Sequence, residues 1–310
     1  MEGYLMKKRL LLLLSLLLLL TGCQMPWQKS KEPKVSLYLT KTGEKKELLL
    51  EDYLAGVVAG EMLPNWPKEA YAAQAILART FTMEFINRGG VREKYGTDLS
   101  DDITETQAYN PDGVSQVILD AVKETRGMVV TYNKEYIKAW FHAFSGGETT
   151  TANTGLNYQK REPPYIKVVQ DPGIDYAPPE DRSWSASYSF EEITKLLGAV
   201  GLSNFPVQNV EISKKNDQGR ATEFTVSGNG NSQVIPGAEF RIALDSTRLK
   251  SIWIDSIQRN DTGVVFLGKG YGHGVGMSQW GAYALAEQGK KAEDIVRYFF
   301  EGVEITKSYR

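Results

Sequence analysis

Glycine occupies every second position from Gly268 to Gly276, and this run restricts the fold more than any other feature of the chain. Glycine loses more conformational freedom on ordering than any other residue, so such a run indicates a backbone that must approach another group closely. The run lacks the third glycine of a dinucleotide-binding motif and does not match a P-loop. One of the two histidines, His273, lies at its centre. The segment predicts either a tight crossing with a buried histidine or a functional loop.

Two apolar helices are predicted between residues 50 and 90. Hydrophobic residues recur at helical spacing from Leu50 to Val58, and Glu61 continues the same face. The second helix is expected to begin at Pro67, a favoured first helical position, and to run to about Asn87, where two glycines follow. It is apolar on most sides, which predicts a buried helix.

Arg79 lies on an apolar stripe of this second helix. A buried guanidinium needs a partner, because an unpaired buried charge is very costly. Glu61 is the nearest candidate in sequence that also lies on an apolar face. The pair has two interpretations: a structural ion pair, or a carboxyl group whose pKa is raised by desolvation and moderated by an arginine, as a general acid requires. The pattern alone does not choose between them.

The second histidine, His142, falls in a strand predicted over residues 136–144, which runs into a Gly-Gly turn. A lone histidine in a strand is more often a packed core residue than a catalyst. Ser145 precedes the two glycines, but the Gly-x-Ser-x-Gly motif of serine hydrolases is absent. Ser278 is predicted to cap a helix that ends at Gln288.

The N-terminus predicts export. Residues 6–9 are mostly basic and residues 10–20 are almost entirely apolar, too short a run to span a bilayer but typical of a secretory signal. The sequence that ends at Cys23 resembles a bacterial lipobox, and the alternative is an ordinary signal with a chance cysteine. We therefore predict a signal peptide over 1–22, a lipidated Cys23 with a tether to residue 34, and a domain over 35–310 on the extracytoplasmic face of the membrane. Cys23 is the only cysteine, so its lipidation would leave no thiol for a disulfide or for catalysis.

The composition is that of a soluble globular domain, with 42% hydrophobic and 24% charged residues. The net charge of -2 argues against nucleic-acid binding. Short β-like runs alternate with turns and predict a β-rich lobe over about 205–267. The predicted fold is α+β, with a helical lobe and a β-rich lobe flanking a substrate groove.

Four motifs follow one another along the chain: VVAGEM at 57–62, AQAILART at 73–80, FHAFSGG at 141–147 and GYGHGVGMSQ at 270–279. Together they resemble the stage II sporulation protein D family, some members of which are described as amidase enhancers. The resemblance covers roughly residues 35–309. It implies a peptidoglycan lytic transglycosylase, which cleaves bonds between N-acetylmuramic acid and N-acetylglucosamine in peptide-stripped strands and leaves 1,6-anhydro ends.

The resemblance also implies residue roles. Glu61 would act as the single acid and base, because the sugar's own C6 hydroxyl replaces the second carboxylate that a hydrolytic glycosidase needs. Arg79 would orient Glu61 or bind the lactyl carboxylate of muramic acid. The remaining motif residues would line the substrate groove: His142, Ser145, Tyr271, His273, Ser278 and Gln279.

Three further expectations follow from this resemblance. Some relatives bind zinc, but Ser145 and Glu148 replace the soft ligands here, so we predict neither zinc nor any other cofactor. Trp66, Tyr158, Tyr271 and Trp280 either stack on sugars or pack in the core. The alternative function is a non-catalytic wall-binding activator of a cell-wall amidase, and the presence of both Glu61 and Arg79 favours catalysis.

Overall fold

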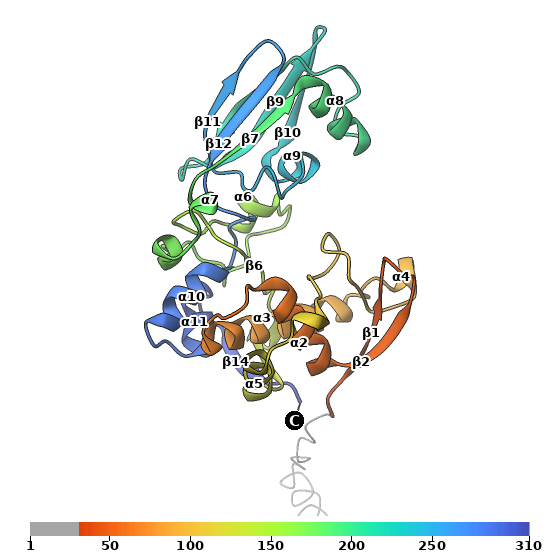
Figure 1. The fold of residues 1–310 in the computed structure, drawn as a ribbon, viewed down its shortest axis with the longest axis vertical. Helices are drawn as coiled ribbons and strands as arrows, with labels where there is room; N and C mark the ends of the chain where they lie inside the picture. Colours follow the sequence, from red (N-terminus) through yellow and green to blue (C-terminus); the bar gives the residue numbers. More distant parts are fainter. Residues whose placement is uncertain (1–30, 310) are drawn as a thin grey trace, which may run out of the picture.

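The computed structural model describes residues 31–309, which form two lobes with separate hydrophobic cores. A β-rich lobe and a helical lobe lie at opposite ends of the long axis (Figure 1). The predicted α+β class is confirmed. The predicted signal peptide, Cys23 and most of the tether lie outside the described residues. No helix within residues 31–309 has the length and apolar character needed to cross a membrane.

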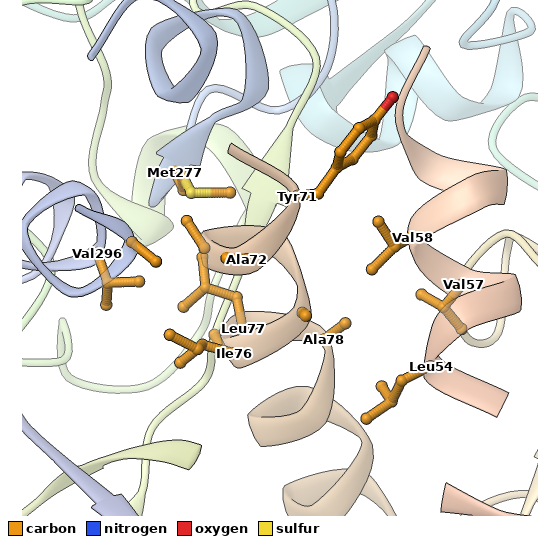
Figure 2. Close-up of a cluster of buried hydrophobic side chains, with 14 of the residues drawn as sticks. Leu54, Val57, Val58, Tyr71, Ala72, Ile76, Leu77, Ala78, Met277 and Val296 are labelled. Atoms are coloured by element: carbon orange, nitrogen blue, oxygen red, sulfur yellow. The ribbon is translucent and has the colours of Figure 1, made fainter. Parts of the chain in front are cut away.

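Two helices form the centre of the helical lobe, α2 (Leu50–Glu61) and α3 (Lys68–Asn87), close to their predicted bounds. Every residue of α3 from position 70 to 80 is buried, as its apolar faces predict. Figure 2 shows the reason: α3 lies between side chains of α2, such as Val57, and side chains from the C-terminal part of the chain, such as Met277 and Val296. The last helical residue of α2, Glu61, therefore stands at the edge of the main core.

The other elements of this lobe surround the two helices. The C-terminal helices are α10 (Gln279–Glu287) and α11 (Ala292–Phe299). One small sheet has the order β2-β1-β3 and another the order β14-β4-β5. The remaining bounds are β1 (Lys34–Tyr38), β2 (Lys45–Leu49), α4 (Arg92–Tyr95), β3 (Leu99–Ser100), η1 (Pro111–Gly113), α5 (Gln116–Glu124), β4 (Met128–Tyr132), β5 (Glu135–Tyr136), η2 (Pro172–Asp175) and β14 (Glu304–Lys307). Two short helices, α6 (Ala152–Leu156) and α7 (Pro179–Arg182), lie between the two lobes (Figure 1).

The β-rich lobe contains two three-stranded antiparallel sheets, ordered β10-β9-β8 and β11-β12-β7. It begins at Trp184 rather than near residue 205, because β7 alternates buried and exposed residues and pairs with β12 along its whole length. Its elements are β7 (Trp184–Ser189), α8 (Phe190–Ala199), β8 (Asn209–Lys215), β9 (Ala221–Gly228), β10 (Asn231–Pro236), α9 (Gly237–Ala243), β11 (Ile254–Arg259) and β12 (Gly263–Gly268).

The glycine run returns the chain from β12 to the helical lobe and crosses the 141–150 segment closely. Phe144 and Tyr271 exchange two backbone hydrogen bonds, of 2.9 and 2.7 Å. The glycines at 270, 272, 274 and 276 all have positive φ. A Cβ on Gly272 would lie 2.7 Å from the Cβ of His142, so only glycine allows this approach. The prediction of a close backbone crossing is confirmed.

The strand predicted over 136–144 is wrong. Only β5 and the two-residue strand β6 (Phe141–His142) form there, because the segment turns to run beside the glycine run. β6 pairs in parallel with β13 (Met277–Ser278), and this short pairing fixes His142 next to the C-terminal motif.

Candidate active site

Glu61 ends α2 and is partly exposed in a pocket of about 260 Å³. Its Oε1 accepts a hydrogen bond of 2.7 Å from the backbone N–H of Ala108. The loop that contains Ala108 can approach the end of α2 because residue 60 is glycine. A Cβ at this position would lie 2.8 Å from the carbonyl carbon of Ala108. Ala108 was not found from the sequence, since a backbone donor leaves no residue signature.

The pocket brings together three of the predicted motifs. Phe141 and Tyr271 supply aromatic walls, and Gln279 begins α10 at its margin. The complete lining is Glu61, Phe141, His142, Ala143, Tyr271, Gly272 and Gln279. Glu61 is the only carboxylic acid among these lining residues. The pocket occurs where the chain returns from the β-rich lobe, and a longer groove stays a prediction.

Burial raises the pKa of Glu61 from 4.5 to about 7, and the hydrogen bond from Ala108 offsets only part of that effect. The C-terminal end of a helix also disfavours negative charge. Glu61 therefore keeps its proton in weakly acidic solution and is partly ionised near pH 7. A carboxylic acid with this pKa, open to a pocket with apolar and aromatic walls, can both donate and accept a proton.

His142 lines the same pocket. Its side chain is neutral, mainly because burial lowers its pKa well below the usual range. Its Nδ1 lies 3.1 Å from the carbonyl oxygen of Val275, which can only accept, so Nδ1 carries the proton. Nε2 is then a hydrogen-bond acceptor, and it has no partner among the described residues. Because the Nε2 atom is itself buried, His142 forms a wall of the pocket and not an exposed acceptor.

The expected pairing of Arg79 with Glu61 is wrong. Arg79 is fully buried and binds Glu51, at 3.1 Å from Nε to Oε1 and 2.6 Å from Nη2 to Oε2. Its Nη1 donates to the carbonyl oxygens of Ala75 and Met128. A guanidinium enclosed in this way has no free surface for a substrate, so the structure contradicts a catalytic position for Arg79.

The reason for the different partner is the antiparallel course of the two helices. Glu51 lies ten residues before Glu61 in α2, which is about 15 Å along a helix. Arg79 lies eleven residues after the start of α3, so it reaches the opposite end of α2 from Glu61. The same counts were available in the sequence, but using them required knowing that the helices pack side by side.

Three other predicted substrate-binding residues do not line the pocket. The hydroxyl of Ser145 is buried and donates to Asp171 Oδ2 at 2.6 Å, and Ser278 is buried as the N-cap of α10, where it accepts from the N–H of Gly281. The capping role of Ser278 is confirmed. His273 Nδ1 accepts from the backbone N–H of Val275 at 3.0 Å, and burial lowers its pKa to about 3. All three hold the crossing segments in place.

Metal ligands do not converge at this site. Within residues 31–309, no group of three or more histidine, cysteine, aspartate or glutamate side chains could hold a metal ion. Glu148 instead accepts hydrogen bonds from Gln170 and from Gln218, at 3.1 and 2.6 Å. The expectation that the protein uses no cofactor stays a prediction.

Of the predicted aromatic residues, only Tyr271 lines this pocket. Tyr158 packs against Trp140 in an edge-on contact. Trp66 is 7% exposed and packs against Trp280, with ring centroids 4.5 Å apart. Trp66, Tyr158 and Trp280 therefore pack within the helical lobe and do not line the Glu61 pocket.

Comparison with known sequences identifies two matched regions and several relatives. Residues 38–132, which contain Glu61, match the family described as stage II sporulation protein. Residues 167–276 match a domain of unknown function, DUF8618. An uncharacterized protein of Brachyspira hyodysenteriae is 33% identical over 84% of this chain and 67% of its own length. The amidase enhancer of Bacillus subtilis is 28% identical over 82% of this chain and 40% of its own length.

The decisive similarity is to stage II sporulation protein D. The protein of that name from Bacillus amyloliquefaciens is 30% identical over 299 residues, covering 91% of this chain and 81% of its own. The Bacillus subtilis protein is 29% identical over 90% of this chain. The chain belongs to the stage II sporulation protein D family.

Proposed function

We propose that this protein is a peptidoglycan lytic transglycosylase in which Glu61 is the acid and base. The observation that supports this proposal most strongly is the position of Glu61. It is the single carboxylic acid, with a pKa of about 7, in a pocket to which three of the four sequence motifs contribute. The similarity to stage II sporulation protein D and to an amidase enhancer supports a role in the cell wall and in sporulation. A lipid anchor at Cys23 would hold the enzyme on the extracytoplasmic face of the membrane.

The reaction needs one proton donor that later becomes an acceptor. Protonated Glu61 gives its proton to the glycosidic oxygen as the bond from C1 of N-acetylmuramic acid to that oxygen breaks. The C6 hydroxyl oxygen of the same sugar then bonds to C1, and its proton returns to the Glu61 carboxylate. Water is not consumed, so no second carboxylate is required, whereas hydrolytic glycosidases use two.

The other pocket residues have roles that their contacts support. His142 shapes one wall of the pocket, and Phe141 and Tyr271 pack against apolar ring faces of the sugar. The family resemblance adds glycan strands from which the stem peptides have been removed as the proposed substrate.

The test is incubation of the full chain with purified glycan strands, with and without stem peptides, followed by mass spectrometry of the products. Wild type should release fragments with 1,6-anhydro ends, mainly from peptide-free strands. Glu61→Gln should lower the rate by about 10²–10⁴-fold, because it removes the transferable proton. Glu211→Gln, an exposed position in the β-rich lobe, is the matched control. Full activity in Glu61→Gln would exclude this mechanism.

A second candidate function is a non-catalytic activator of a cell-wall amidase, favoured by the similarity to the amidase enhancer over 82% of the chain. The two functions separate in one experiment with an amidase and intact peptidoglycan. An activator would raise the release of stem peptides equally with wild type and Glu61→Gln, and neither would yield anhydro ends.

A further inference from the structure

A second cavity, also of about 260 Å³, flanks the end of α2 that carries Glu61. It lies between this helix end, the turn that leads into α3, and the beginning of α5. Asn65 shapes the turn with a φ of +64°, a left-handed conformation that asparagine tolerates better than most residues. The cavity is lined by Ala59, Met62, Pro64, Asn65, Trp66, Tyr71, Asn110, Gly113, Ser115, Val117 and Ile118.

The chemistry of this lining selects a small, neutral and polar ligand. None of the lining residues is charged. Asn65 and Asn110 bring amide groups and Ser115 a hydroxyl, while Met62 and Trp66 bring apolar surface. Pockets for drug-sized ligands occupy roughly 300–1,000 Å³, so this cavity suits a single ring with its substituents. An N-acetylated hexosamine combines these features, since it has hydroxyls, an amide and an apolar ring face.

The cavity is joined structurally to the Glu61 pocket in two ways. Ala59 and Met62 line the cavity, whereas Glu61, which stands between them in the sequence, lines the pocket. The helix end therefore separates two adjacent sites. In addition, Trp66 of the cavity packs against Trp280, the residue that follows Gln279 of the pocket. Tyr283 packs edge-on against Trp66 at 5.1 Å and helps to hold it.

We propose that this cavity is a second subsite, which binds an uncharged N-acetylglucosamine unit of the glycan strand that reaches Glu61. This inference rests on the proposed substrate class but not on catalysis. The uncharged lining fits a sugar without an attached peptide, which N-acetylglucosamine is at every position of the strand.

The test uses two matched substitutions on α5. Val117 lines the cavity and is 43% exposed, whereas Leu119 is 45% exposed on the same helix and does not line it. Val117→Trp should fill the cavity mouth, and Leu119→Trp should leave it open. Calorimetry with a disaccharide and a hexasaccharide of N-acetylglucosamine, in a Glu61→Gln background, measures how affinity grows with length. We expect Val117→Trp to weaken hexasaccharide binding about tenfold relative to Leu119→Trp.

Methyl NMR of the chain with only Glu61→Gln gives a second measurement that does not depend on how Val117→Trp folds. The hexasaccharide should shift the methyl signals of Val117 and Ile118 but not those of Leu119. Equal hexasaccharide affinity in the two tryptophan variants, or unmoved Val117 and Ile118 signals, overturns the subsite. If wild type yields no anhydro product while the tryptophan variants differ as expected, catalysis fails and the subsite stands.

Discussion

The two ends of α2 each carry a glutamate, and the two side chains have opposite surroundings. At the first turn, Glu51 accepts four hydrogen bonds: two from Arg79, one from the N–H of Gly127 and one from the hydroxyl of Tyr309. At the last turn, Glu61 has the Ala108 N–H and no cation beside it in the pocket. The Glu51 carboxylate accepts hydrogen bonds at both oxygens and holds the fold together. The Glu61 carboxyl group has a single donor and can exchange a proton. Burial alone therefore does not distinguish the two glutamates, whereas the number of hydrogen-bond donors around each carboxylate does.

The contrast between Glu51 and Glu61 predicts its largest effect when each glutamate is replaced by glutamine in a separate variant. Glu51→Gln leaves the buried Arg79 without a counter-charge and should lower the free energy of unfolding by about 3–5 kcal/mol. Glu61→Gln removes a desolvated acid and should leave the free energy of unfolding at neutral pH unchanged or slightly higher. Chemical denaturation of the two variants measures this directly. Equal destabilisation by both would break the contrast between the two ends.

The pH dependence sharpens the same contrast. Because its pKa is about 7 in the folded chain and 4.5 in the unfolded chain, Glu61 keeps its proton in the folded state over that window. Its contribution to stability is complete below pH 4.5 and is lost as the pH rises to about 7 and beyond. Cleavage should fall about tenfold per pH unit above 7, where the acid form disappears. Unfolding at several pH values should show this slope in wild type and its loss in Glu61→Gln.

The smallest effect concerns the residues that hold the crossing segments. Ser278→Ala removes the N-cap of α10 and should cost about 1 kcal/mol of stability. Because Ser278 does not line the pocket, the activity of the folded fraction should stay close to wild type. Denaturation together with product release per folded molecule checks both. A large loss of cleavage without a loss of stability would return Ser278 to the substrate site.

The elements that local pattern determines were predictable, and the partners chosen by packing were not. Apolar spacing and Pro67 located α2 and α3, and the glycine run predicted a close crossing. The partner of Arg79 depends on how two helices lie against each other, which spacing within one helix does not contain. The same holds for Ser145, whose partner Asp171 is 26 residues away, and for the backbone donor at Ala108. Of the predicted site, Glu61, His142, Tyr271 and Gln279 meet in one pocket.

The hydroxyl of Tyr309 lies 2.6 Å from Glu51, a contact that closes a loop of 258 residues. Together with the pairing of β14 and β4, it ties the last part of the chain to the first helix. The hydrogen bonding of Glu51 is therefore complete only when the segment around Tyr309 has joined the fold. A chain that lacks this segment would leave Glu51 without one of its four donors. The base of the helix that carries Glu61 thus depends on contacts from a segment more than 250 residues away.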